Sequence, residues 1–209
     1  MNTITVTTQA ELDAAIAASP DRIEIRGNGE FFVRGHTTVY AAYADATVYA
    51  YDNSKVYAYA DATTVRASDT VVVRASDTVV VRAYGNSKVV DARTPRGWAQ
   101  FNDLAVVDGT VTLYKALEDD LVSGKDYIPT TWPTSGTLTA TDWDPEPRCG
   151  GGLHLSPTIE AARSYRPGAP RYLKCTAVLD DIVPISTDKC KVATVIVVEE
   201  VSREGEVVS

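Results

Sequence analysis

The chain has 209 residues, three cysteines and a formal net charge of −8 at pH 7. This length suits one large domain or two small ones, and the acidic balance excludes the broad basic surface that binds nucleic acid directly. An odd, sparse cysteine count argues against a disulfide framework, so we expect a reducing, cytoplasmic location. The sequence shows no leader pattern and no apolar run long enough to cross a bilayer, so we expect no membrane association.

Residues 1–30 predict a strand, a helix and a second strand. Thr8 and Glu11 have the spacing of a capping box, in which each residue satisfies a backbone N–H of the other. The helix that follows is expected to continue to about Ser19, because Pro20 cannot extend it. This segment is expected to cap whatever structure comes next.

A repeat of eight or nine residues occupies residues 39–91. Each copy alternates apolar and polar residues, which indicates a strand. Turn-forming residues separate the copies at Asp52, Asp61, Asp69, Asp77 and Gly85. One copy is too short to close a coil, so two strands form each coil of 16–17 residues. The inward valines then stack in two columns, Val39, Val56, Val73 and Val89 on one face and Val48, Val65 and Val81 on the other.

The entry segment ITVTTQAELDAAIAASPDRIEIRG resembles the strand–helix–strand entry of right-handed, pectate-lyase-like parallel β-helices. This resemblance implies a fold, not a lyase activity. Together with the repeat, it leads us to expect a mainly β protein. Residues 1–100 are predicted to form a short parallel β-solenoid with an N-terminal helix cap, and residues 101–209 a small α+β domain.

The outward positions of the repeat predict an interaction face. They carry tyrosine and arginine at Tyr40, Tyr57, Tyr59, Arg66, Arg74 and Arg82. Both residue types are enriched in protein interfaces, which suggests a protein partner. The alternative is that they are good strand formers on a solvated sheet face.

In the second half, Asp108–Gly109 predicts a hairpin with a type I′ turn. We expect Trp98 and Phe101 to close the open end of the solenoid. Ser156 is the predicted N-cap of a short helix, with Pro157 at its first position. The runs RYLKCTAVLDDIVPI and KVATVIVVEEV then predict one strand each.

Four segments resemble a family of unknown function that is common in phages and actinobacteria: YKALEDDLVS, CGGGLHLSPTIEAARSY, RYLKCTAVLDDIVPI and DKCKVA. The match spans residues 112–201. Members of that family often lie beside short β-solenoid repeats. The resemblance implies a phage or prophage origin, and it implies no secure activity.

Part of the same region is similar, more distantly, to ADP-ribosyltransferase folds. Those folds open with a Tyr-His-Gly or Tyr-Arg-Gly strand, and here Tyr114, Lys115 and Ala116 stand at that place. A later strand that leads into a helix corresponds to residues 152–156. Lys115 replaces the usual His or Arg and Ala116 the usual Gly, so the pattern is degenerate.

This similarity implies roles for particular residues. It places the ligand-binding side at Tyr114, Lys115, Gly152 and Tyr165, and the catalytic side at His154, Ser156 and either Glu199 or Glu200. NAD would be the cofactor, and the glutamate would stabilise the developing oxocarbenium ion. If the fold is degenerate, we expect ligand binding without a cofactor.

Other constellations stay open. Cys149 and His154 have a spacing that allows a nucleophile–base pair, and Cys175 and Cys190 would complete a zinc site with them. Both of the latter alternate with apolar residues, so we expect them in the core and expect no metal. Gly150 to Gly152 precede a helix start, where backbone N–H groups hold anions.

We therefore expect an accessory interaction protein that presents a rigid solenoid face to a host or viral protein, joined to a transferase-like ligand-binding domain. The first alternative is an ADP-ribosyltransferase or another NAD-using enzyme. The second is a structural component of a virion or of its assembly. The sequence leaves the oligomeric state open.

Overall fold

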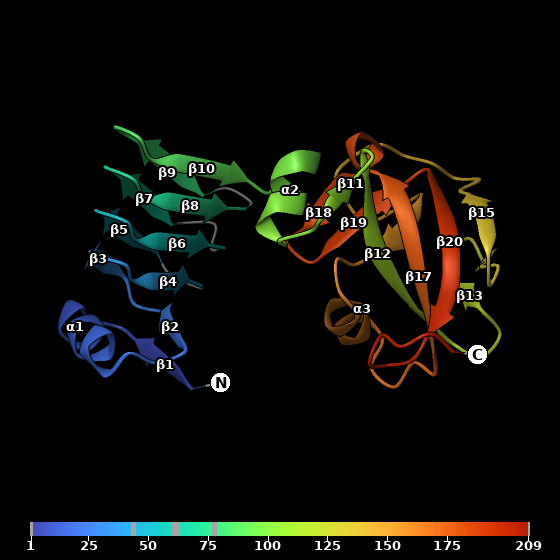
Figure 1. Ribbon diagram of the computed structural model, residues 1–209, viewed down its shortest axis with the longest axis horizontal. Coiled ribbons are helices and arrows are strands. Elements are labelled where there is room, and N and C mark those ends of the chain that lie inside the picture. Colours follow the sequence, from blue (N-terminus) through green and yellow to red (C-terminus); the bar gives the residue numbers. More distant parts are fainter. Residues whose placement is uncertain (1, 43–44, 60–62, 77–78, 209) are drawn as a thin grey trace. The chain divides into compact units, whose positions relative to one another are not determined.

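A computed structural model describes residues 2–42, 45–59, 63–76 and 79–208. The chain is mainly β and forms two compact units, Met1–Ala92 and Arg93–Ser209 (Figure 1). The first unit contains parallel sheets, as the repeat predicts. The predicted turn residues Asp61 and Asp77 lie outside the described residues. Within the described ranges, no helix is both long and apolar enough to cross a membrane.

The first unit begins with strand β1 (Thr3–Val6), helix α1 (Gln9–Ala18) and strand β2 (Arg22–Ile25), and β1 pairs in parallel with β2. The predicted capping box is confirmed. The Thr8 hydroxyl accepts from the Glu11 N–H, and the Glu11 carboxylate accepts from the Thr8 N–H. These two bonds satisfy donors at the start of the helix that no backbone carbonyl reaches. The helix ends at Ser19 in the left-handed conformation.

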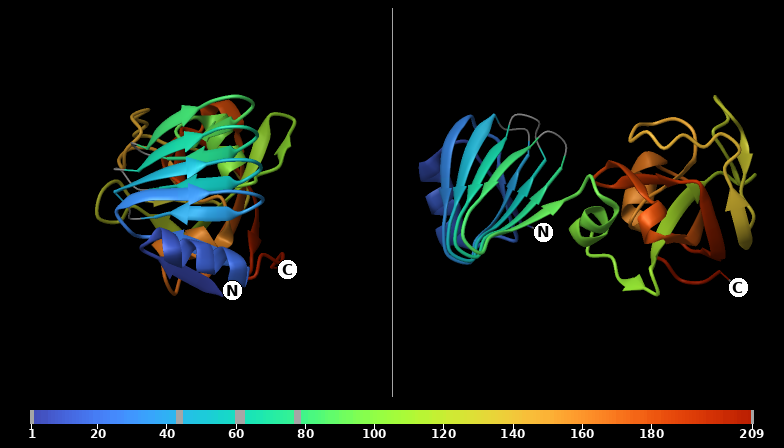
Figure 2. Two further views of the ribbon diagram at one scale, coloured as in Figure 1. Left: turned by 90° about the vertical axis from the view of Figure 1, so that its left-hand side faces the viewer. Right: turned by 90° about the horizontal axis from the view of Figure 1, so that it is seen from above.

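The strands that follow alternate between two parallel sheets, and Figure 2 shows them succeeding one another in a stack with α1 at its beginning. One sheet continues from β2 through β4 (Thr38–Ala41), β6 (Lys55–Ala58), β8 (Val72–Ala75) and β10 (Lys88–Asp91). The other contains β3 (Gly29–Val33), β5 (Ala46–Ala50), β7 (Thr64–Ala67) and β9 (Val80–Ala83).

The two valine columns are confirmed by the strand register. Val39 pairs with Val56 and then with Val73 and Val89, while Val48 pairs with Val65 and then with Val81. Val39, Val56 and Val73 of the first column and Val48 and Val65 of the second are fully buried. Val81 is only partly buried and Val89 is 42% exposed. These two differ because β9 and β10 are the last strands of their sheets.

The second unit contains a five-stranded antiparallel sheet and a three-stranded sheet. The larger sheet has the order β11 (Val106–Val107), β12 (Thr110–Leu117), β17 (Arg171–Val178), β20 (Thr194–Val201) and β15 (Gly136–Thr139). The smaller has the order β16 (Leu153–Leu155), β19 (Lys189–Val192) and β18 (Val183–Ser186). A short pair, β13 (Val122–Ser123) and β14 (Thr130–Thr131), and helices α2 (Pro95–Phe101) and α3 (Ile159–Tyr165) complete the unit.

The hairpin at Asp108 and Gly109 is confirmed. Both residues have positive φ angles, 49° and 74°, as a type I′ turn requires. The prediction of two long strands is wrong. A 3₁₀ turn, η1 (Leu179–Asp181), separates β17 from β18, and the second run divides into β19 and β20.

The predicted helix cap at Ser156 is also wrong. Thr158 caps α3, because its side chain accepts from the Ala161 N–H at 3.1 Å. Ser156 instead joins the two sheets of the unit through its backbone. Pro157 therefore precedes the helix and is not its first residue.

Trp98, which the sequence predicts at the end of the repeats, belongs to the second unit. It is fully buried in the main core of the second unit, and its indole N–H donates to the Ser186 carbonyl at 2.8 Å. The second unit therefore begins at Arg93, before helix α2, whereas the sequence predicts a boundary after residue 100. Phe101 is the last residue of α2.

Candidate ligand-binding site

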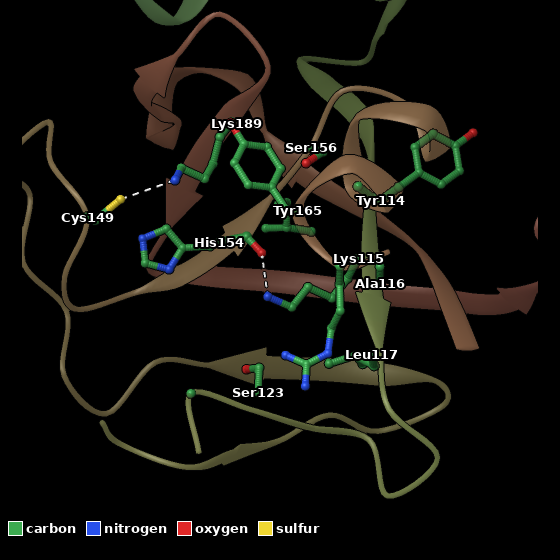
Figure 3. Close-up of a pocket in the computed structure, with 14 residues that line it drawn as sticks. Tyr114, Lys115, Ala116, Leu117, Ser123, Cys149, His154, Ser156, Tyr165 and Lys189 are labelled. Atoms are coloured by element: carbon green, nitrogen blue, oxygen red, sulfur yellow. Dashed lines mark hydrogen bonds between the residues drawn. The ribbon is translucent and has the colours of Figure 1, made fainter. Parts of the chain in front are cut away.

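A cavity of about 240 Å³ lies where the two sheets of the second unit meet. Tyr114 on β12 and Ser156 after β16 form reciprocal backbone hydrogen bonds of 2.8 and 2.9 Å. This link holds the two strands together, so the neighbouring Lys115 and His154 line the same cavity (Figure 3). Helix α3 contributes Tyr165 to the lining, and Arg166 follows it.

A larger cavity of about 750 Å³ adjoins the first. The two cavities share Lys115, Ser123, Gly124, Cys149 and His154. The larger one extends along the glycine-rich loop 150–152 and beneath Tyr127 and Ile128, which are both exposed. The site is therefore a narrow polar pocket that opens into a wider, more apolar one.

Lys115 is enclosed by groups that do not neutralise it. Its Nζ donates to the His154 carbonyl at 3.0 Å and lies 5.2 Å from the centre of the Trp132 ring. Burial lowers the pKa of Lys115 to about 8, and the nearby cations Arg166 and Lys189 act in the same direction. Within the described part of the chain, no carboxylate lies within ion-pairing distance of this amine.

His154 experiences the same environment. Burial lowers its pKa to about 4, and the positive charges of Lys115, Lys189 and Lys191 lower it further. The imidazole is therefore neutral at pH 7. Its Nε2 atom is buried and has no hydrogen-bond partner among the described residues.

Cys149 and Lys189 meet at the mouth of the cavity, beside the His154 ring (Figure 3). The Lys189 Nζ donates to the Cys149 sulfur at 3.1 Å and lies 4.6 Å from the centre of the Tyr165 ring. The Tyr165 hydroxyl donates to Asp188 at 2.5 Å. Burial first, and this hydrogen bond second, raise the pKa of Tyr165 to about 12, so the phenol stays protonated.

The loop 150–152 requires glycine because it runs against other groups at short range. A Cβ atom on Gly151 would lie 1.7 Å from the Asp142 carbonyl oxygen, and one on Gly152 would lie 2.9 Å from the Trp143 ring. The Gly152 N–H donates to the Asp142 carboxylate at 3.1 Å. Asp142 thus anchors the loop that forms one wall of the larger cavity.

Most of the predicted site residues come together. Tyr114, Lys115, His154, Ser156 and Tyr165 line the smaller cavity, and Gly152 lines the larger one.

The predicted glutamates do not line either cavity. Glu199 pairs with Lys174 at 2.8 Å, and Glu200 pairs with Arg171 at 2.5 Å. All four side chains belong to β17 and β20 of the larger sheet. The two glutamates that the transferase resemblance indicates therefore form ion pairs outside both cavities.

Sequence reasoning missed three cations: Arg166 and Lys189, which line the smaller cavity, and Lys191, which lies on the same strand as Lys189. Arg166 pairs with Glu118 at 2.6 Å and still lines the cavity. Lys191 is fully buried, and its Nζ has no hydrogen-bond partner among the described residues. The signal was present, since two lysines flank Cys190 in a strand that is otherwise apolar.

The cysteines do not gather around a metal. Cys175 and Cys190 are buried, as predicted, and burial raises the pKa of the Cys175 thiol to about 12 and also raises that of Cys190. Cys149 is exposed. Over the residues that the structure describes, no group of three His, Cys, Asp or Glu side chains has the proximity that a metal ion needs.

The predicted interaction face of the first unit consists of stacked rows. In one row the rings of Tyr40 and Tyr57 stack at 4.7 Å, and Arg74 lies 5.2 Å from the Tyr57 ring. Tyr59 stacks on Tyr40 at 6.4 Å, and burial raises its pKa.

On the other sheet, Arg66 lies 5.4 Å from the centre of the Tyr49 ring and pairs in register with Arg82. Arg66 and Arg82 are both exposed. The six predicted residues thus lie on two outward faces. Tyr40, Tyr57 and Arg74 share one register with Tyr59 beside them, and Arg66 and Arg82 lie on the other face.

Comparisons with known proteins give no relative on which to base a function. No protein-family profile, no curated protein and no solved structure matches this chain.

Proposed function

We propose that the second unit binds a small anionic ligand in the cavity around Lys115 and His154. The main support is that the charge of the cavity lining differs in sign from the charge of the whole chain. The chain as a whole has a net charge of −8, yet the smaller cavity is lined by Lys115, Lys189 and Arg166 and by no described carboxylate. Cations that line a poorly solvated pocket attract an anion more strongly than they do in water.

The energetics of Lys115 support this proposal. A partly buried ammonium without a carboxylate is costly, and a bound anion would offset that cost. Ser123 adds a hydroxyl to both cavities. Phosphate and pyrophosphate groups match such a mixture of ammonium, guanidinium and hydroxyl donors.

NAD and ADP-ribose should be tested as ligands, because the resemblance to ADP-ribosyltransferases implies that the site binds them. Turnover of NAD is the alternative function. The ion-paired positions of Glu199 and Glu200 favour binding without transfer.

Calorimetric titration of the full chain with pyrophosphate, ADP-ribose and NAD tests the proposal. At least one of the three is expected to bind, and Lys115→Gln is expected to weaken that binding at least tenfold. Lys174→Gln is the matched control, since it removes a lysine that is paired with Glu199 outside the cavity. Equal affinity in wild type and Lys115→Gln, or no binding of any of the three, would contradict the proposal.

We also propose that the first unit is a short capped solenoid whose outward faces bind a protein. The alternation of strands between two parallel sheets supports the solenoid. The stacked rows support the binding face, because rings and guanidinium groups that already contact each other lose little freedom on binding. The resemblance to a phage-associated family makes a host or viral protein the expected partner.

An affinity pull-down with the double variant Tyr57→Ala, Arg74→Ala tests this second proposal. One stoichiometric partner of the wild-type protein is expected to be lost in that variant and retained in Thr38→Ala, Lys88→Ala, which alters a neighbouring row of the same sheet. Finding the protein as a constant component of purified virus particles would favour the structural alternative.

A further inference from the structure

The nitrogen of Lys115 has the setting of a nucleophile as well as that of a charge. The side chain is partly exposed, and it lines both cavities. The His154 carbonyl accepts one hydrogen bond from Nζ, and the Trp132 ring covers another side. With no described carboxylate paired to it, the amine is not held in its charged form.

Its neighbours favour the neutral amine, which is the form that reacts. Burial and the cations Arg166 and Lys189 hold the pKa of Lys115 at about 8. At pH 8 about half of such an amine is neutral, whereas an ordinary lysine is neutral in roughly one molecule in 300. This difference favours Lys115 over a surface lysine as a nucleophile.

We propose that Lys115 forms a reversible imine with an aldehyde or ketone that carries an anionic group. The inference rests on the proposed anion site and names the class of ligand that enters it. Lys189 and Arg166 line the same cavity as Lys115, so they are placed to hold the anionic group while the carbonyl carbon faces Lys115. Exposed Tyr127 and Ile128 border the wider cavity, where the rest of the ligand would lie.

The step balances without an oxidant or a reductant. The neutral Lys115 nitrogen attacks the carbonyl carbon, and the carbonyl oxygen takes up a proton that the amine releases. The resulting carbinolamine loses its hydroxyl group and a second amine proton as one molecule of water. A C=N bond has then replaced the C=O bond, and hydrolysis reverses the sequence.

The other nucleophiles at the site are less suited to this step. Lys189 donates to the Cys149 sulfur and lies over the Tyr165 ring, where its charge is placed to hold the anionic group. Lys191 is fully buried and lines neither cavity. Cys149 can add to an aldehyde, but the product has no C=N bond for borohydride to reduce.

Reductive trapping tests the inference directly. The full chain is incubated with pyridoxal 5′-phosphate, reduced with borohydride, and mapped by peptide mass spectrometry. One adduct per chain is expected on Lys115, and inorganic pyrophosphate present before the reduction should prevent its formation. Its rate of formation is expected to rise with pH and to level off above about 8, whereas labelling of ordinary lysines continues to rise towards their pKa near 10.5. Lys115→Arg should abolish the adduct, and Lys174→Arg should leave it unchanged.

An adduct on Lys189, or one spread over many lysines, would overturn the inference. Mapping of the wild-type protein gives this answer even if a variant does not fold. Pyrophosphate binding, measured separately by calorimetry, distinguishes the two proposals. If pyrophosphate binds and no Lys115 adduct forms, the imine is wrong and the anion site stands. If pyrophosphate neither binds nor competes, the anion site is wrong as well.

Discussion

Burial and neighbouring positive charge lower the pKa values of both Lys115 and His154. The folded second unit therefore favours the neutral form of each group more than water does. Protonation of either group as the pH falls therefore lowers the free energy of unfolding of this unit. The residues that would bind a ligand are thus also the residues that make this unit sensitive to pH.

For His154, acid is expected to destabilise the second unit. The folded pKa of about 4 lies below the unfolded value of 6.5, so the unfolded state binds more protons between these two values. The contribution of the neutral His154 ring to the free energy of unfolding should be complete above pH 6.5. It should be lost as the pH falls towards 4. An NMR titration should give a midpoint near 4 for the imidazole signal that disappears in His154→Gln. A midpoint near 6.5 would contradict the buried, cation-flanked position of the ring.

Gly151 gives a second prediction at this scale. In Gly151→Ala the new Cβ atom would lie 1.7 Å from the Asp142 carbonyl oxygen, so the backbone of the loop must move. We expect a loss of about 1–3 kcal/mol in the stability of the second unit and a weaker affinity for the anionic ligand. Gly168→Ala is the control, because a Cβ there meets no atom within 4 Å and the strain from its positive φ of 82° arises at a residue that lines neither cavity. It should leave the affinity unchanged, and an equal loss of affinity in both variants would show that the loop is not part of the site.

At the scale of elements, local patterns predicted the structure wherever a local cause decides it. The alternation of valines set the strand register of the first unit, and Asp108–Gly109 set the hairpin. Tertiary pairing decided the rest. Ser156 and Thr158 are both acceptable caps, but Ser156 pairs with Tyr114 of another strand, so Thr158 caps the helix. No proline or glycine marks the break at Leu179–Asp181, so the sequence could not place it.

The candidate site shows the same division. The resemblance to transferase motifs indicated Lys115, His154 and Tyr165, which do line the cavity. It also indicated Glu199 and Glu200, whose ion pairs with Lys174 and Arg171 depend on the register of β17 against β20. That register shifts at Lys174 and Cys175, and this irregularity has no signature in the sequence.

The valine columns allow a matched test of the first unit. Val56 is fully buried, while Val89 in the same column is 42% exposed. Val56→Ala should cost about 2–3 kcal/mol, from the lost methyl groups and the cavity that they leave. Val89→Ala should cost less than about 1 kcal/mol, because little area is lost from the core. Denaturant unfolding followed by circular dichroism measures both, and equal costs would contradict the inward column.

In the whole molecule, each of the two units has its own hydrophobic core and its own kind of candidate binding surface. The first unit has a valine and alanine core and outward rows of tyrosine and arginine. The second has its own core, which includes Trp98 and Trp132, and a cation-lined cavity. Because the chain is acidic overall, the cavity has to attract an anion at short range, inside its walls. Added salt should therefore weaken binding less than it weakens binding to an open basic surface.

Two-dimensional ¹H–¹⁵N NMR of the full chain during a pyrophosphate titration tests whether the cavity of the second unit is the anion site. We expect the shifted backbone amides to cluster at residues 114–117, 150–156 and 189–191, with one saturable affinity. Shifts that cluster instead on the arginine rows around Arg66 and Arg82, or no saturable shifts, would contradict it.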